Sequence, residues 1–172
     1  MGLFSGNIDD LRSLYTNQLR LLLSTEEQII DALPKMIEAA TDVQLKQALQ
    51  THLQETEAQK ARLDGILNDL IGDDNDKDCD VTDELISAGE KIVKTAKDDA
   101  VRDAGIIAAA QKIEHFEIAS YGSVRDWAIL LGETNHANLL QTSLNEEKNA
   151  DKVLTAVSQQ RNPEAASIIT AA

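Results

Sequence analysis

Hydrophobic residues recur along this 172-residue chain at steps of three and four, the spacing that places side chains on one face of an α-helix. Four long stretches follow this pattern, over residues 8–40, 43–71, 99–131 and 135–160, and a shorter one covers residues 82–95. Strict alternation of apolar and polar residues, which is typical of a half-buried β-strand, does not extend over any long stretch. The pattern therefore predicts an all-α protein.

Turn and cap residues indicate how these helices are connected. Thr41 and Asp42 provide a short polar turn with a residue suited to N-capping, and Gly72 and Gly132 are natural helix ends. Pro163 is expected to end the last helix. The first two long helices are joined tightly, as are the last two, so each pair is expected to form an antiparallel hairpin. Two hairpins joined by a connection of roughly 27 residues, with the short helix inside it, predict a ferritin-like four-helix bundle.

The chain is expected to form a single domain over residues 1–172, with the bundle core over about 8–160 and a tail over 161–172 that shows no clear pattern. Pro34 lies inside the first helix and is expected to kink its last turns rather than end it. The acidic run DDNDKDCD, residues 73–80, is expected to be a solvated linker. It contains Cys79, the single cysteine, which has no partner for an internal disulfide.

Ionisable residues interrupt the hydrophobic stripe of each long helix near its middle. On the third long helix the stripe runs through Ile113, Glu117 and Tyr121, and Glu114 lies on the same face. The interruptions on the four helices together are Glu26, His52, Glu55, Glu114, Glu117, Glu147 and Asp151. Other acids fall off the stripes and are expected on the solvated surface, namely Glu38, Glu57, Asp64 and Glu146.

These interruptions are predicted to lie at one height along the bundle. Glu26 precedes the first turn by about 15 residues and Glu55 follows it by about 14, so at about 1.5 Å per residue each lies roughly 20 Å from that turn. Glu117 and Glu147 each lie about 15 residues from the Gly132 turn, one before it and one after. The four helices are therefore expected to bring their polar residues together near mid-bundle.

A group of buried carboxylates needs compensating charge, because burying even one unpaired carboxylate costs on the order of several kcal/mol. Two divalent or trivalent cations would offset most of this charge. Oxygen ligands with one imidazole suit iron or manganese, with zinc as an alternative. Taken singly, the residues have simpler interpretations: a glutamate at the edge of a stripe, His52 as a hydrogen-bonded core histidine, or Asp151 paired with a lysine or capping a polar network. Their coincidence on four helices favours a metal site.

Charge and composition narrow the possible functions. The chain carries 30 acidic and 16 basic residues, a net charge of -14 that disfavours nucleic acids and anionic membranes as partners. It has no apolar run long enough to predict a membrane span and no secretory signal at its start, so a cytoplasmic location is expected. Motifs for a serine or cysteine nucleophile and for a phosphate-binding loop are also missing. The run DDNDKDCD lacks the glycine and distal glutamate of an EF-hand.

Four stretches of the chain carry a family resemblance: LSTEEQIIDALPKM, THLQETEAQ, IIAAAQKIEHFEIASYG and LNEEKNAD. Through them the chain resembles the YciE/YciF family of bacterial ferritin-like stress proteins over about residues 8–160. The resemblance implies a four-helix bundle close to rubrerythrin and bacterioferritin, often dimeric, with a di-metal site inside the bundle. Carried over position by position, the family pattern matches Glu26, His52, Glu55, Glu114, Glu117 and Glu147.

The chain departs from the wider ferritin-like pattern, which has a Glu-x-x-His pair on each of two helices. Here the second helix shows the reverse order, His52 before Glu55, and the fourth carries Glu147 and Asp151 without a histidine. His115 lies one residue off its stripe, and His136 lies near a helix end. Neither of these two histidines is expected to be a ligand.

Two functions are consistent with these residues. The first is a stress-response protein whose carboxylate-rich site holds two ions of iron or manganese and oxidises Fe(II) or consumes oxygen or peroxide. The alternative is a non-catalytic binding or structural protein with a weak or vestigial metal site. Tyr121, one turn after Glu117 on the same face, is expected either to pack in the core or to serve as a hydrogen-bonding or redox-active neighbour. A homodimer is the assembly that the resemblance implies.

Overall fold

The computed structural model of the protein describes residues 8–72 and 78–168. These residues form five α-helices and no strand, so the predicted all-α fold is confirmed. The helices are α1 (Leu11–Ala39), α2 (Val43–Ile71), α3 (Asp80–Thr95), α4 (Asp99–Leu130) and α5 (Thr134–Ala166).

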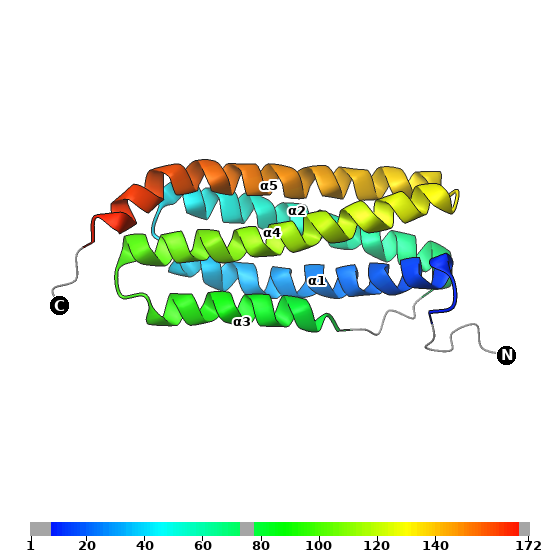
Figure 1. Cartoon of the computed structure of the whole chain (residues 1–172), viewed down its shortest axis with the longest axis horizontal. Helices are drawn as coiled ribbons and strands as arrows, with labels where there is room; N and C mark the ends of the chain where they lie inside the picture. The colour runs from blue at the N-terminus through cyan, green and yellow to red at the C-terminus, as the bar shows by residue number, and fades with distance from the viewer. Residues whose placement is uncertain (1–7, 73–77, 169–172) are drawn as a thin grey trace.

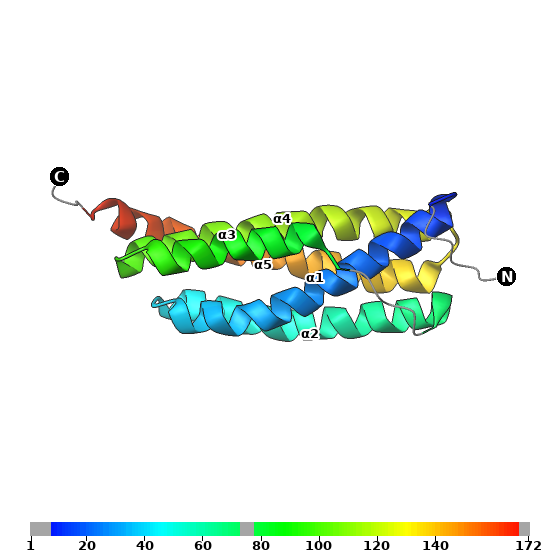
Figure 2. The same cartoon turned by 90° about the horizontal axis from the view of Figure 1, so that it is seen from below.

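The four long helices form an elongated bundle (Figure 1). Helices α1 and α2 form one antiparallel hairpin and α4 and α5 the other, and each of these two pairs packs extensively within itself. The long connection between the hairpins carries α3, which lies along the outside of the bundle against α1 and α4 (Figures 1 and 2). A Cβ on Gly105 would clash with the side chain of Ile92, so a glycine here lets α3 approach α4 closely. This is the ferritin-like arrangement that the connection lengths predict.

The predicted turns hold the hairpins together. Asp42 is the N-cap of α2, and its carboxylate accepts a hydrogen bond of 2.8 Å from the backbone N–H of Leu45. Gly72 ends α2 with a φ of 72°, and Gly132, in the turn between α4 and α5, has a φ of 79°. Both values lie in the left-handed region that favours glycine. The helix continues through Pro34, as the sequence predicts.

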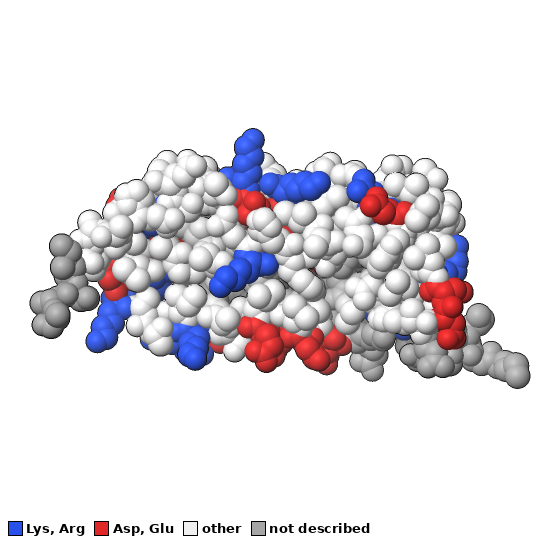
Figure 3. Space-filling model, viewed as in Figure 1, with Lys and Arg blue, Asp and Glu red and all other residues white. Residues whose placement is uncertain are grey.

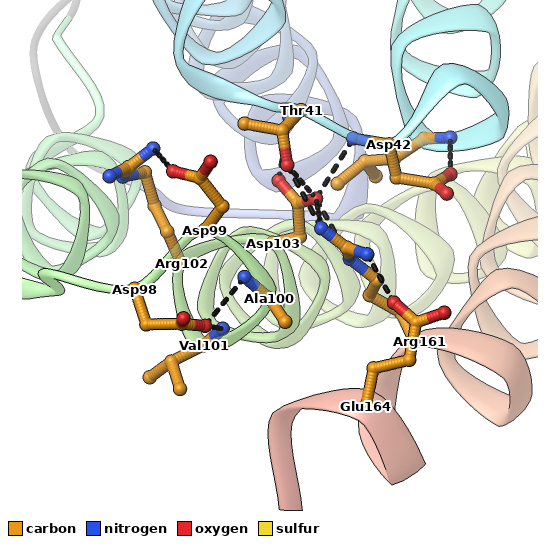
Figure 4. A network of polar contacts seen from close by, with 11 residues as sticks. Thr41, Asp42, Asp98, Asp99, Ala100, Val101, Arg102, Asp103, Arg161 and Glu164 are labelled. Carbon is orange, nitrogen blue, oxygen red and sulfur yellow. Dashed lines mark hydrogen bonds and ion pairs between the residues drawn. The ribbon is translucent and has the colours of Figure 1, made fainter. Parts of the chain in front are cut away.

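The end of the last helix differs from the prediction. Helix α5 continues through Pro163 to Ala166 instead of ending before the proline, and Figure 1 shows its final turns bending at this end. The side chain of Arg161 anchors this segment, because its guanidinium lies 2.8 Å from the buried carboxylate of Asp103 on α4 (Figure 4). This contact holds the end of α5 against the rest of the bundle, and no sequence pattern indicated it.

The predicted solvated linker is only partly described, since residues 73–77 lie outside the described ranges. Within the described part, Cys79 is buried at the start of α3. The prediction that it lies in a solvated loop is therefore wrong. Its backbone N–H donates to the Ser24 hydroxyl at 3.0 Å, and the Thr82 hydroxyl donates to its sulfur at 3.3 Å. These contacts fasten the connection to α1.

The hydrophobic core consists of two clusters that occupy opposite ends of the bundle. One includes Tyr15, Leu19, Leu63 and Leu140, near the turn between α4 and α5. The other includes Ile29, Leu45, Ile106 and Leu154, near the turn between α1 and α2. On every long helix the polar interruptions fall between the two clusters, at the middle of the bundle.

The surface shows charges of both signs. On the face in Figure 3, acidic side chains gather near the start of α3, whereas basic side chains lie near its end and in separate groups elsewhere. Among the described helices, none is both long enough and apolar enough to cross a membrane.

Candidate metal centre

Four of the predicted ligands meet in the middle of the bundle. Each of His52 on α2, Glu114 and Glu117 on α4 and Glu147 on α5 offers a ligand atom, and these atoms all lie within 4.8 Å of one another. All four side chains are buried. Side chains from three helices therefore meet at the same height along the bundle axis. The helix register predicts this convergence.

Two further predicted ligands flank this group. Glu26 on α1 is fully buried, and its Oε1 accepts a hydrogen bond from the Tyr121 hydroxyl. Glu55 on α2 lies on the other side, with its carboxylate 4.0 Å from Nδ1 of His52 and 26% of its side chain exposed. Neither residue belongs to the closely spaced group of four. Four of the six predicted residues therefore form a compact centre, and the other two flank it, Glu26 fully buried and Glu55 partly exposed.

A layer of polar side chains on α2 and α5 positions Glu147. The amide of Gln59 donates to Oε1 of Glu147, and it also donates to Glu146 at 3.2 Å. Arg62 binds the Glu146 carboxylate through two N–H groups, at 2.6 and 2.8 Å. The prediction of Glu146 as a solvated surface acid is therefore wrong, because an ion pair with Arg62 holds it half-buried between the helices.

Most oxygen atoms of the centre lack a donor within the protein. Both oxygens of Glu117 have no hydrogen-bond partner, and neither does Oε2 of Glu26, Glu114 or Glu147. Oε1 of Glu114 lies 3.4 Å from Nε2 of His52. Ionised carboxylates only accept hydrogen bonds, so two of them can bond to each other only when one is protonated, as for Glu26 with Glu117 and Glu114 with Glu147. Buried acceptors without partners are rare in folded proteins and call for a specific explanation.

Burial changes the protonation of these acids. It raises the pKa of Glu26, Glu114 and Glu117 well above the usual value, and the neighbouring carboxylates, above all Glu147, raise them further. The pKa of Glu147 rises to about 7, again mainly through burial. The pKa of the half-buried Glu55 is raised for the same reason. In the absence of a cation, these carboxylates are therefore driven to take up protons.

The two non-carboxylate groups of the centre are neutral. Burial lowers the pKa of His52 to about 4, so its imidazole is uncharged near pH 7 and can donate a nitrogen lone pair. Burial also raises the pKa of Tyr121 well above its ordinary value, and the adjacent Glu26 adds to the effect. The phenol therefore stays protonated and donates a hydrogen bond to Glu26.

This donor set fits a transition metal. Several carboxylate oxygens and one neutral imidazole nitrogen, gathered within ligand range in a buried space, are the ligands that iron and manganese accept and that zinc tolerates. The oxygens without a donor are a second indication, since a cation would compensate the charge of several of them at once.

The other candidate residues lie outside the centre. Asp151 accepts a hydrogen bond of 3.0 Å from the Gln111 amide and lies 3.4 Å from Nε2 of His115. Asp151 therefore belongs to a polar network with α4, the second of the two alternatives given for it. His136 is buried near the start of α5 and contacts Asp69 at 3.7 Å. Neither histidine joins the group of four.

Sequence reasoning missed the Arg62–Glu146 pair beside the centre. Gln59 interrupts the apolar stripe of α2, so a polar contact inside the bundle could have been inferred for it. Arg62 and Glu146 gave no comparable signal, because both lie off the apolar stripes of their helices, where solvent-exposed side chains are expected.

Comparison with known proteins agrees with the geometry. The chain is 36% identical to Protein YciF of Escherichia coli (strain K12) over 153 residues, which cover 87% of this chain and 90% of that protein. The crystal structure of the E. coli stress protein YciF matches with a TM-score of 0.86 at 33% identity, over 91% of this chain and 99% of the other. YcfI of Rhodopseudomonas palustris, provisionally described as a structural protein, matches with a TM-score of 0.84 at 40% identity, over 89% of this chain and 98% of its own. The sequence profile of one family covers residues 10–167, and the chain belongs to this family, which is described as Domain of unknown function (DUF892).

Proposed function

We propose that the mid-bundle centre binds two ions of iron or manganese, and that the protein uses them to oxidise Fe(II) or to consume oxygen or peroxide. The observation that carries this proposal is the set of buried carboxylate oxygens that have no partner within the protein. Proteins retain such groups at a cost in stability, and cation binding is the function that uses them directly.

The surrounding side chains prepare the carboxylates for ligand binding. Tyr121 holds one oxygen of Glu26, and Gln59 holds one oxygen of Glu147, and in each case the second oxygen has no donor. Contacts of this kind orient ligands before a metal arrives. Glu114 and Glu117, one turn apart on α4, add the remaining buried carboxylates, and His52 adds the single nitrogen.

When bound, two adjacent iron or manganese ions supply electrons to oxygen or peroxide, which no side chain of this centre can do alone. The protein's contribution is to position the ligands and to hold their charge. The two hydrophobic clusters enclose the centre at both ends of the bundle. The ligand oxygens exchange protons for cations on loading, because the raised pKa values keep them protonated beforehand.

A second function is favoured by one relative. YcfI of R. palustris is provisionally described as a structural protein, and the centre contains one imidazole where the wider ferritin-like pattern has two. A non-catalytic protein with a weak metal site is therefore the alternative. It predicts metal uptake without turnover.

The experiment is an anaerobic titration of chelator-treated protein with Fe(II) or Mn(II), followed by exposure to oxygen or peroxide. We expect about two ions per chain and metal-dependent consumption of one oxidant. The Glu117→Gln variant is expected to lose at least one ion, and the exposed Glu57→Gln on α2 serves as its matched control. Uptake without turnover would favour the structural alternative. Wild-type protein that binds neither metal would overturn the proposal.

The resemblance also supports a homodimer, a role in stress responses and, with the charge of the chain, a cytoplasmic protein that does not bind nucleic acid. These features stay predictions. Sedimentation of the full chain is the measurement that decides the homodimer.

A further inference from the structure

A cleft runs along the bundle between α2 and α5 and ends at the candidate centre. Its volume is about 370 Å³, and its wall on α2 extends from Gln44 to Glu55. At about 1.5 Å per residue this wall is roughly 16 Å long. On α5 the wall extends from Asn149 to Val157.

The inner end of the cleft is formed by residues of the centre. Three of the predicted ligands line it, namely His52, Glu55 and Glu114. Glu55 is the one among them whose side chain is substantially exposed. A molecule that moves inward along this cleft therefore meets the Glu55 carboxylate before the fully buried acids.

A second cavity reaches the centre from the side of α1, α3 and α4, but it is far smaller. Its volume is about 40 Å³, and apart from His52 and Glu114 its lining is formed by apolar residues and Gly89. A hydrated divalent cation carries about six water molecules, which need roughly 60–90 Å³ at roughly 10–15 Å³ each. The cleft between α2 and α5 can hold such an ion, and the apolar cavity cannot.

The α2–α5 interface is closed on the other side of the centre, beyond Glu55 on α2. There Gln59 bonds to Glu147, and Arg62 bonds to Glu146 and, at 3.1 Å, to the Ser143 hydroxyl. The guanidinium of Arg62 also places a positive charge on this side. An approaching cation would have to break these contacts and pass that charge.

We propose that hydrated divalent cations reach the centre through the cleft between α2 and α5, and that Glu55 is the first carboxylate that they meet. This inference rests on the metal-binding function proposed above and specifies its entry route. The geometry suits the task, since Gln44, Gln47, Thr51 and Asn149 offer amide and hydroxyl groups to the water shell of the ion. Of the described residues that line the cleft, none is Lys or Arg.

A charge placed on the α5 wall of the cleft tests this route. Asn149 on α5 is exposed and lines the cleft, whereas Asn138 is exposed on the same helix, roughly 16 Å away at about 1.5 Å per residue. That separation exceeds the Debye length of about 10 Å at 0.1 M salt, so a charge at Asn138 is screened from the cleft. Asn149→Lys and Asn138→Lys change the net charge equally and form a matched pair.

The probe is Co²⁺, mixed with chelator-treated full-length protein in a stopped-flow instrument and followed by its visible absorption. We expect Asn149→Lys to slow association by about tenfold at low salt and Asn149→Asp to accelerate it, because local charge changes cation encounter rates. The control variants Asn138→Lys and Asn138→Asp should load at the wild-type rate. The number of ions bound at equilibrium should be the same in all of them.

A steric variant provides an independent test. Val153→Trp fills the cleft from a position that is 39% exposed, and Val101→Trp adds the same bulk at a 40% exposed position on α4 that does not line the cleft. We expect the first to slow loading and the second to leave it unchanged. Equal rates for Asn149→Lys and Asn138→Lys, or for the two tryptophan variants, would overturn the entry route while leaving the metal centre in place. Wild-type protein without any Co²⁺, Fe(II) or Mn(II) uptake at equilibrium would overturn both.

Discussion

Two carboxylates of α4, Asp103 and Glu117, are both fully buried, yet their surroundings are opposite. Asp103 lies at the end of the bundle and accepts hydrogen bonds from the backbone N–H groups of Thr41 and Asp42, at 2.8 and 2.9 Å, and from the Thr41 hydroxyl at 2.7 Å. Arg161 adds an ion pair (Figure 4). Glu117, in the middle of the bundle, has no donor for either oxygen other than a protonated Glu26.

The comparison separates two uses of a buried negative charge. Around Asp103 the protein itself provides all the donors, so the charge joins α5 and the turn between α1 and α2 to α4. Around Glu117 the neighbours are other acids, so the protein leaves the compensation to something outside the chain. A carboxylate of the first kind stabilises the fold, and one of the second kind lowers stability until a cation binds.

The largest effect is expected from breaking the satisfied site. Asp103→Asn removes the charge that Arg161 faces and replaces one acceptor oxygen with an N–H₂ group that points at other donors. We expect the free energy of unfolding to fall by about 3 kcal/mol, as it does when one partner of a buried ion pair is removed. Chemical denaturation with and without metal measures this loss.

The matched control for this variant is Asp126→Asn, which makes the same chemical change at an exposed position of the same helix. Its stability should match that of the wild-type protein. The loss in Asp103→Asn should also be equal in metal-free and metal-loaded protein, because the two sites lie in different parts of the bundle. A loss that disappears on metal loading would contradict the separation of the two sites.

An intermediate effect is expected from pH, and it concerns the mid-bundle site. In the metal-free protein, burial raises the pKa of Glu117 and its neighbours above the unfolded value of 4.5, and that of Glu147 to about 7. Above pH 4.5 the folded chain therefore binds more protons than the unfolded chain, so stability falls as the pH rises. His52, with a pKa lowered to about 4, opposes this between pH 4 and 6.5, but it is one group against several.

We expect metal-free protein to lose about 2 kcal/mol between pH 5.5 and 7.5, measured by denaturation in the presence of a chelator. With saturating Mn²⁺ the trend should reverse, because the cation displaces protons from its ligands and binds better as the pH rises. Metal-free protein that becomes more stable over this range would contradict the assignment of the centre as an uncompensated cluster.

The same contrast explains what the sequence could predict. Asp103 also lies on the apolar stripe of its helix, three residues before Ile106, so a carboxylate on a stripe does not by itself indicate a metal site. Height along the bundle axis distinguishes Asp103 from the acids of the metal centre. Asp103 is 11 residues before Glu114, roughly 16 Å along the helix, and therefore far from the level where the other acids meet.

Helix periodicity was sufficient for the fold and for the convergence of His52, Glu114, Glu117 and Glu147, since both depend on regular geometry. It could not predict the contacts that depend on side-chain pairing across distant helices. Helix α5 continues beyond Pro163 where Arg161 pairs with Asp103, and Glu146 is half-buried where it pairs with Arg62. In each case an ion pair between distant helices accompanies a feature that the local sequence did not indicate.

The smallest effect is expected from Glu117→Gln, and its sign is the informative part. The amide has nearly the shape of the acid and is neutral at every pH, so the folded protein no longer has to protonate or bury a charge at this position. Without metal at pH 7.5 we expect the variant to be about 1 kcal/mol more stable than the wild-type protein. With metal it should be less stable, because a ligand is missing.

Glu117→Gln and Asp103→Asn convert a fully buried carboxylate of the same helix into its amide, so their difference isolates the surroundings. Opposite signs in metal-free denaturation would mean that the protein compensates one charge and relies on a cation for the other. If Glu117→Gln instead destabilised the metal-free protein as Asp103→Asn does, Glu117 would have a partner within the folded chain. A cation would then no longer be needed to account for four acids at one depth of an apolar bundle.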